Sequence, residues 1–446
     1  MPKGKYWNEE LETLPRERLE ALQLRSLQEE LAFAYARSPY YKRAWDEVNA
    51  RPEDVKTLAD LAKFPFIDKK TQRDTQGVGS FLGELAAVPE EEAVFVSTSS
   101  GSTGVPTLSP FTARDFDEFQ DVEARLFWQA GIRPNDRYVH ALNFALYVGG
   151  PDVIGAQRTG ALCIWVGAVP SERLLFVLQA YQPTAIWTSP SYIIALGEKA
   201  LHSGIDPKKD LSVRKIIVAG EMGGSIGATR KAITDIWGAE LYDFYGLSDI
   251  FGACAGHCEH HDGLHIAEDH IYVETVGLDS GEPLPPGERG ELVFTTLRKR
   301  ARPIIRFRTG DIGRIDVSPC ECGRTLGRIY VDGRKDDMFI VSAVNVYPSD
   351  IEYVIRAMPE ISNEYTIRIF EESYTCKYEV NVENVSDISD DEVREKTVNA
   401  MKARIGVRPA IVNVHPHGTL ERSTHKAKRV IDQRTETVAK SRGEGI

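Results

Sequence analysis

The chain has 446 residues, of which 42% are hydrophobic and 27% charged, as in globular proteins with two or three domains. Its 66 acidic residues exceed the 54 basic ones, which argues against a nucleic-acid partner because such binding needs clustered lysine and arginine. The sequence has no apolar run long enough to span a membrane and no apolar signal segment. We therefore expect a cytosolic protein with reduced cysteines, and a homodimer is the ordinary expectation for its assembly.

The N-terminal part is expected to be helical. Leucines recur at near-helical spacing between residues 8 and 48, and Ser38-Pro-Tyr-Tyr41 interrupts this pattern. Prolines and glycines divide residues 53–86 into short helical and loop segments.

A loop rich in glycine and hydroxyl residues follows a β-prone run at residues 93–98. Glycines let the backbone of Ser99-Ser-Gly-Ser-Thr-Gly-Val-Pro-Thr107 turn closely, so that backbone N–H groups and hydroxyls point at anionic oxygens. Neither the Walker A spacing nor the Rossmann spacing is present, and a flexible linker is the alternative interpretation. We interpret the stretch as a phosphate-binding loop formed by Ser99, Ser100, Gly101, Ser102, Thr103 and Gly104.

Apolar runs then alternate with helical patterns. Strands are expected at 93–98, 137–142, 161–167, 184–188, 215–219 and 240–245, and helices near 112–130, 171–181, 191–203 and 225–237. This alternation predicts an α/β fold, with a parallel sheet covered by helices on both faces. Ligands of such sheets bind beyond the carboxyl ends of the strands, where the phosphate loop and Tyr245-Gly246 would lie.

The last third of the sequence changes character twice. Strand patterns at 291–297 and 303–308 predict a smaller antiparallel sheet within residues 271–332. The elements expected after Gly333-Arg334 are a strand at 338–341, a helix at 348–357, a hairpin near 364–383, a helix at 390–404 and a strand at 410–415. We therefore predict a large domain at residues 1–332 and a compact α+β domain at 333–446.

Cysteine and histidine gather in two stretches, one with Cys254, Cys258 and four histidines and the other with Cys320 and Cys322. Thiolates together with imidazole in a reducing compartment indicate tetrahedral Zn²⁺. The spacing is not that of a standard zinc-binding pair, so unconnected thiols remain the alternative.

Four more stretches accompany the phosphate loop in a fixed order: Asp243-Phe-Tyr-Gly-Leu-Ser-Asp249, Arg308-Thr-Gly-Asp311, Gly333-Arg-Lys-Asp-Asp-Met338 and Arg422-Ser-Thr-His-Lys-Ala-Lys-Arg-Val-Ile-Asp432. Together the five stretches resemble adenylate-forming enzymes, and most of all the phenylacetate–coenzyme A ligase family, over about residues 5–435. The resemblance implies an ATP- and Mg²⁺-dependent ligase that activates an aromatic carboxylic acid as an acyl-adenylate and passes it to CoA. It also implies a helical cap on the large domain and a mobile C-terminal domain.

The resemblance assigns nucleotide-binding roles to residues beyond the phosphate loop. Asp311 is expected to accept hydrogen bonds from the ribose hydroxyls, and Ser248 to lie near the phosphates. Asp249 stands where the family usually has a glutamate that binds Mg²⁺. Val105 stands where the family usually has a phosphate-binding lysine, so backbone donors and Lys426 would have to compensate. The remaining expected nucleotide contacts are Gly220, Glu221, Asp243, Phe244, Tyr245, Gly246 and Arg334.

The resemblance also implies catalytic, hinge, acyl and metal positions. Lys426 would bridge the acid and the α-phosphate during adenylation, with Lys428 as its competitor and His425 in place of the family's usual glycine. The small domain would rotate about Asp336. The acyl pocket is expected from His140, Phe144, Tyr147, Ala219 and Tyr245, although a core role is the alternative for each. The zinc ligands would be Cys258, His265, Cys320 and Cys322, with Cys254 or His257 as replacements for one of them.

Other functions stay open on the sequence alone. The acyl group is equally compatible with transfer to an amine or to a carrier-protein thiol, and the aromatic acid with a benzene dicarboxylate. A nucleotide-binding sensor without activity is a third class, favoured only by Val105.

Overall fold

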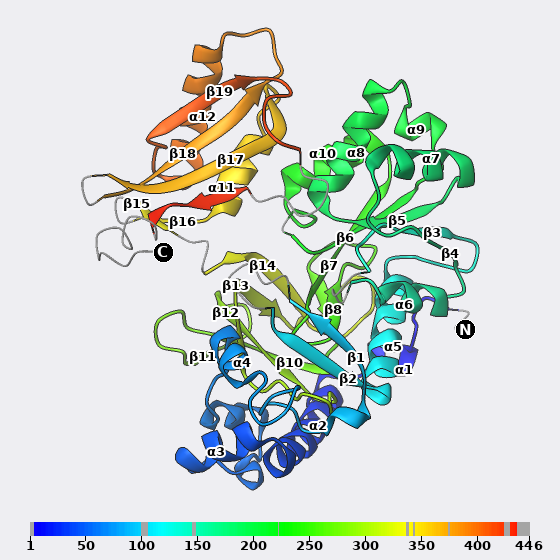
Figure 1. Ribbon diagram of the computed structural model, residues 1–446, viewed down its shortest axis with the longest axis vertical. Helices are drawn as coiled ribbons and strands as arrows, with labels where there is room; N and C mark the ends of the chain where they lie inside the picture. Colours follow the sequence, from blue (N-terminus) through cyan, green and yellow to red (C-terminus); the bar gives the residue numbers. More distant parts are fainter. Residues whose placement is uncertain are drawn as a thin grey trace.

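The computed structural model describes residues 4–99, 106–144, 149–221, 223–335, 339–341, 344–372, 375–422 and 429–434. Figure 1 shows a large N-terminal body and a smaller C-terminal one. The predicted N-terminal helices are present as α1 (Glu9–Glu12), α2 (Arg16–Arg37), α3 (Pro39–Glu47) and α4 (Lys69–Thr75), with 3-10 turns at Pro52–Asp54, Leu58–Lys63 and Glu90–Glu92. The break lies at the predicted place, because the Ser38 side chain caps α3 by accepting a hydrogen bond from Tyr41 N.

A twelve-stranded sheet runs through the large body. From one edge to the other its strands are β11 (Pro283–Leu284), β10 (Ile271–Val276), β12 (Gly290–Thr296), β13 (Phe307–Asp316), β14 (Arg328–Arg334), β9 (Leu264–Ile266), β8 (Gly252–Gly256), β7 (Glu240–Leu247), β6 (Lys215–Val218), β5 (Ala185–Thr188), β3 (Arg137–His140) and β4 (Leu162–Trp165). The strands from β7 to β4 pair in parallel, as predicted. The antiparallel strands predicted within 271–332 are present as β10 to β14, and they continue through β9 and β8 into the parallel strands, because β7 pairs antiparallel with β8.

Helices cover both faces of the parallel strands, as the alternation predicted. Ile217 faces a core closed by α5 (Ala113–Gln129) and α6 (Asp152–Arg158). Its neighbour Ile216 faces a second core, under α7 (Ser171–Tyr181), α8 (Pro190–His202) and α10 (Gly227–Trp237), with the short α9 (Pro207–Asp210) nearby. Adjacent residues of one strand point to opposite faces, so a strand buried on both sides must be a continuous apolar run.

The strand before the phosphate loop does not join the parallel strands, contrary to prediction. β1 (Ala93–Thr98) pairs antiparallel with β2 (Leu108–Thr112) in a two-stranded sheet of their own. Only residues 99–107 separate the two strands, too few for the crossover that parallel neighbours require. β1 and β2 are therefore the two strands of a hairpin.

The expected strand at 303–308 is also largely wrong, because β13 begins only at Phe307. Arg306 has a left-handed backbone with φ of 50°, which interrupts an extended run. The buried Tyr41 hydroxyl instead anchors this segment, donating to Pro303 O and accepting from Ile305 N, each at 3.0 Å.

The C-terminal body contains the predicted strand, helix, hairpin, helix and strand. They are β15 (Phe339–Val341), α11 (Pro348–Arg356), β17 (Ile361–Glu372) with β18 (Thr375–Asn384), α12 (Asp390–Ile405) and β19 (Ile411–Pro416). The prediction missed β16 (Val344–Val346), which pairs with β15, and β20 (Val430–Asp432), which adds an edge to the sheet β19-β18-β17-β20. Among the described residues, hydrogen bonds from Asn363 Nδ2 to Glu198 Oε1 and from Ser349 Oγ to Asp332 O join the bodies.

The predicted domain boundary at 332/333 lies close to where the large sheet ends. Gly333 and Arg334 still pair with Ile312 and Asp311 in that sheet, and β15 follows at Phe339. Within the described residues, no helix combines the length and the apolar character needed to cross a membrane.

Candidate functional site

The two ends of the phosphate loop are held together. Ser99 N donates to Thr107 O, and Ser99 Oγ accepts from both Thr107 N and Thr107 Oγ1, at 3.0 to 3.1 Å. The predicted phosphate ligands Ser100, Gly101, Ser102, Thr103 and Gly104, together with Val105, lie outside the described residues. The described ends fix where the loop begins and returns.

Asp249 lies beside this loop with its carboxylate almost fully buried. Lys69 Nζ, at the start of α4, donates to both carboxylate oxygens at 2.5 and 2.6 Å, and Thr107 Oγ1 donates to Oδ1 at 3.2 Å. Burial would raise the pKa of Asp249, yet nearby Lys69 and Arg302 hold it below its usual range. An ionised carboxylate therefore faces the phosphate loop, as a ligand for a hard cation requires.

Asp311 links three strands. Its Oδ2 accepts a hydrogen bond from Tyr245 OH at 2.5 Å, and its Oδ1 accepts one from Arg334 Nη1 at 2.9 Å. Burial raises the pKa of Tyr245 well above its ordinary value, so the hydroxyl stays protonated as a donor. Residues from two predicted motifs, Tyr245 and Arg334, thus converge on the Asp311 carboxylate of a third.

Strand β7 delivers Tyr245 to this place through a tight backbone approach. A Cβ on Gly246 would lie 1.9 Å from Gly252 O, so only glycine fits where β7 meets β8. Ser248 follows in the turn that leads to Asp249 and is half-buried. The motif from Tyr245 to Asp249 therefore links the Asp311 carboxylate, which Tyr245 contacts, to the carboxylate of Asp249.

Other predicted nucleotide contacts have structural partners of their own. The Phe244 ring is buried against Phe127 and Trp187, and the Glu221 carboxylate accepts from Ser191 N at the start of α8. Asp243 is buried, which raises its pKa to about 7, and it accepts from Ser225 Oγ at 2.6 Å. Gly220 is exposed, with φ of 88°. These residues lie on or directly after the parallel strands β6 and β7.

The predicted acyl-pocket residues divide into two kinds. His140 is fully buried, with its ring nitrogens 2.8 Å from Tyr138 OH and from Gly149 O, and burial lowers its pKa to about 3. It is thus a neutral core residue. Phe144 is partly exposed and its ring stacks on Trp165 at 5.5 Å. Ala219 and Tyr245 are half-buried, and Tyr147 lies outside the described residues.

The predicted catalytic lysine and hinge, Lys426 and Asp336, also lie outside the described residues. The stretch that carries Lys426 is anchored on both sides. Arg422 Nη2 pairs with the buried Glu383 on β18 at 2.7 Å, and Arg429 Nη1 pairs with Glu364 on β17 at 3.0 Å. Arg422 and Arg429, which flank the stretch, are therefore both held to strands of the C-terminal sheet.

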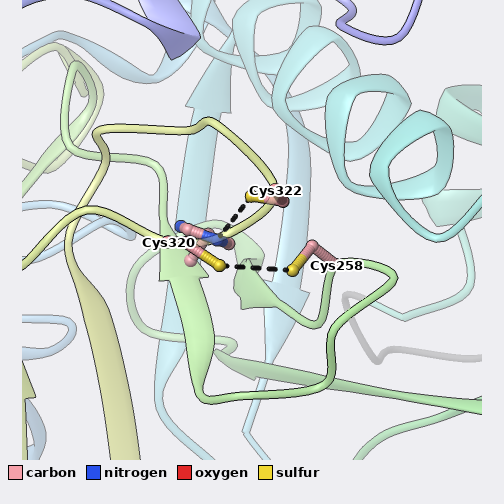
Figure 2. A group of neighbouring side chains, drawn as sticks. Cys258, Cys320 and Cys322 are labelled. Atoms are coloured by element: carbon pink, nitrogen blue, oxygen red, sulfur yellow. Dashed lines mark hydrogen bonds between the residues drawn. The ribbon is translucent and has the colours of Figure 1, made fainter.

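The four predicted zinc ligands lie together and are buried. One ligand atom from each of Cys258, His265, Cys320 and Cys322 falls within 4.8 Å of the other three. Cys258 follows β8, His265 lies on β9, and the other two cysteines lie in the loop between β13 and β14 (Figure 2). The alternatives Cys254 and His257 are outside the group, and His257 Nδ1 accepts from Asp243 N.

The geometry of this cysteine–histidine cluster fits a tetrahedral ion. Cys258 Sγ and Cys320 Sγ are 3.8 Å apart. This equals the edge of a tetrahedron with zinc–sulfur bonds of about 2.3 Å. His265 Nδ1 lies 2.9 Å from Leu326 O, a bond that leaves Nε2, 3.3 Å from Cys322 Sγ, as the ligand atom. Hydrogen bonds from Cys258 and His265 lower the pKa of the Cys322 thiol, which favours the thiolate form that a metal ion would bind.

Sequence reasoning missed Lys69, Thr107 and Arg302 around Asp249, and Trp165 beside Phe144. Lys69 begins a short, highly charged helix whose residues have the pattern of a solvated surface. Thr107 could have been predicted from the sequence, because it directly follows the proline of the phosphate loop. The other three are separated from the motifs in sequence, and only the fold brings them close.

Comparisons with known proteins cover nearly the whole chain. The family model "AMP-binding enzyme" matches residues 15–296, and "AMP-binding enzyme C-terminal domain" matches 343–434. Phenylacetate-coenzyme A ligase of Thermus thermophilus is 36% identical over 95% of this chain and 99% of its own length. The enzyme of the same name from Escherichia coli is 34% identical over 95% and 97%.

Solved structures show the same fold. 2-Hydroxyisobutyryl-CoA ligase in its postadenylation state, with an acyl-AMP bound, aligns with a TM-score of 0.92 at 28% identity, over 99% of this chain and 96% of that one. The structure of the same enzyme with CoA in the thioesterification state aligns with a TM-score of only 0.73 at 29% identity, over 100% of this chain and 96% of that one.

Proposed function

The chain belongs to the AMP-binding enzyme family, in the branch of the phenylacetate–coenzyme A ligases, and from this premise we propose that it joins an aromatic carboxylic acid to CoA. The acid's carboxylate attacks the α-phosphate of ATP, giving acyl-AMP and pyrophosphate. The CoA thiol then attacks the acyl carbonyl and AMP leaves. The observation that carries the proposal is Asp311, fixed by Tyr245 and Arg334 beside the end of β7.

The residues of the site would have different roles in the formation of the acyl-adenylate. Asp311 would accept the ribose hydroxyls, since an ionised carboxylate offers acceptors only. The buried, ionised Asp249 would hold Mg²⁺, which when bound supplies positive charge to the phosphate oxygens. The protein positions the acid and neutralises charge, and no nucleophilic side chain is required.

The acid proposed is an aromatic monocarboxylate. The stacked Phe144 and Trp165 give a flat aromatic surface at the end of β3 and β4, suited to an aryl ring. A dicarboxylate would need a cation near the ring. His140 is neutral and both its ring nitrogens are occupied, and Arg158 pairs with Asp117. These contacts favour the monocarboxylate.

We further propose two conformations of the small domain, residues 333–446, with Asp336 as the hinge. Support comes from the relative solved in two states, to which this structure aligns with TM-scores of 0.92 and 0.73. The arrangement described here resembles the postadenylation state, and Lys426 would leave the site when the small domain rotates. In the same sense, we propose Zn²⁺ as a structural ion in the cysteine–histidine cluster.

The decisive experiment is a pyrophosphate-release screen over aryl and alkyl acids, with and without CoA. We expect turnover with aryl acids and an acyl-CoA product that appears only when CoA is present. Turnover with alkyl acids alone would refute the aryl assignment. Release of pyrophosphate without any CoA ester would favour the second candidate, transfer to an amine or a carrier-protein thiol.

Replacement of Asp311 tests the ribose contact. In Asp311→Asn, half of the carboxylate becomes a donor facing Tyr245 OH and Arg334, so both the local bonds and the ribose bonds are weakened. We expect the KM for ATP to rise about 10- to 100-fold. Asp316→Asn is the matched control, because Asp316 lies on the same strand and pairs with Arg328. Equal KM values in the two variants would contradict the ribose role.

A further inference from the structure

The phosphate loop carries no basic side chain. Residues 99–107 contain neither lysine nor arginine, although the proposed ATP brings several negative charges to this place. Backbone donors supply only partial charges. Another element of the fold must therefore supply the neutralising cation.

Lys69 is placed to be that cation. Its ammonium lies 3.2 Å from Thr107 Oγ1, at the point where the loop returns, and within 2.6 Å of both Asp249 oxygens. About a third of its side chain is exposed, whereas the carboxylate beneath it is buried. The ammonium thus covers Asp249 on the accessible side, where a metal ion and a triphosphate would arrive.

Arg302 adds a second positive charge behind this pair. The side chain is 2% exposed, and its Nε and Nη2 have no hydrogen-bond partner in the described part of the chain. Arg302 is close enough to Asp249 and Lys69 to lower the pKa of both. The third nearby cation, Lys299, is already satisfied by Ser109 Oγ and by the backbone carbonyls of Asp249 and Ile250.

One carboxylate therefore faces two cations that need counter-charge. A buried guanidinium without a partner is unfavourable unless an anion is bound nearby. A triphosphate bound with Mg²⁺ would correct this imbalance. The metal ion would take the Asp249 carboxylate, and the displaced ammonium would turn to the phosphate oxygens.

We propose that Lys69, backed by Arg302, forms the subsite for the β- and γ-phosphates of ATP and for the departing pyrophosphate. The proposal rests on the ATP-dependent function given above. The Lys69 ammonium lies on the carboxylate with which Asp249 would hold Mg²⁺, and it would turn to the phosphates when Mg·ATP binds.

The first test is binding of Mg·ATP and of inorganic magnesium pyrophosphate to the full-length protein by calorimetry. Lys69→Met should weaken both about 10- to 100-fold, the usual loss for one charged hydrogen bond. Lys70→Met is the matched control, since Lys70 is the next residue of the same helix, is exposed and pairs with Asp74. Equal affinities in the two variants would overturn the proposal.

The magnesium dependence gives a readout that a purely structural ion pair would not change. At saturating ATP, Lys69→Met should need less Mg²⁺ for half-maximal pyrophosphate release, because no ammonium competes for Asp249. An unchanged or increased Mg²⁺ requirement would contradict the exchange of cations.

Arg302→Met tests the buried charge. Removing an unpaired guanidinium should leave the midpoint of thermal unfolding unchanged or raise it, while weakening Mg·ATP binding. Wild-type affinity for Mg·ATP in this variant would overturn the role of Arg302.

If wild-type protein binds Mg·ATP but no acid supports turnover, only the proposed acid fails. If the wild type does not bind Mg·ATP, both proposals fail.

Discussion

Lys426→Ala is expected to slow acyl-adenylate formation by a factor on the order of 10² to 10³, the usual loss for one preorganised donor. The ammonium is a compact charge suited to the oxyanion that develops when the acid attacks phosphorus. Two partly buried Arg–Glu contacts, Arg422 with Glu383 and Arg429 with Glu364, hold the residues on either side of its stretch to the C-terminal sheet. We therefore expect Lys426 to move with the small domain.

The same variant should convert supplied acyl-AMP and CoA to the thioester at a rate near that of the wild type, because the rotated domain has carried Lys426 away. The measurement is single-turnover pyrophosphate release without CoA, compared with thioester formation from acyl-AMP. Lys428→Ala is the matched control, two residues further on. Equal loss of both half-reactions would refute the two-conformation mechanism, and full adenylation in Lys426→Ala would assign the role to Lys428.

Loss of the cysteine–histidine cluster should have the largest effect on stability. Protein purified without added zinc should contain about one Zn²⁺ per chain, and Cys320→Ser with Cys322→Ser should release it. The cluster organises the 317–327 loop, in which Tyr6 OH donates to Cys322 O and the buried Arg324 pairs with Glu12 at 2.7 Å. The N-terminal helices would lose this anchor, so we expect the unfolding midpoint of the large domain to fall by roughly 5–15 °C.

Cys254→Ser is the control for that experiment. Cys254 is equally buried but lies on β8, outside the cluster, so the variant should keep its zinc. Zinc content below one ion per ten chains in the wild type, together with wild-type stability of the double variant, would leave the cysteines as simple thiols. Zinc loss in Cys254→Ser would instead mean that the ligand set is wrong.

The sequence by itself determined the elements whose signal is local. Strands buried on both faces must be apolar throughout, and helices covering them show the 3.6-residue period, so β3 to β7 and the helices α5, α7, α8 and α10 were predictable, whereas the short α6 and α9 were missed. The clustering of Cys258, His265, Cys320 and Cys322 was predictable as well, because the resemblance to the ligase family singles out these four residues. The phosphate loop, the Tyr245 motif and Asp311 were recognisable from their order along the chain.

Only the tertiary structure decided what depends on partners distant in sequence. The residues of a strand do not show whether it pairs in parallel or antiparallel, and β1 was therefore assigned to the parallel strands. Its short connection to β2 makes the pair an antiparallel hairpin instead. The sequence also does not show which partner a polar or charged side chain contacts. Lys69 has the composition of a solvated helix, and His140 that of a polar pocket residue. The contacts with Asp249 and Thr107 hold Lys69 in an ion pair where the phosphate loop returns, and the contacts with Tyr138 and Gly149 make His140 part of the core.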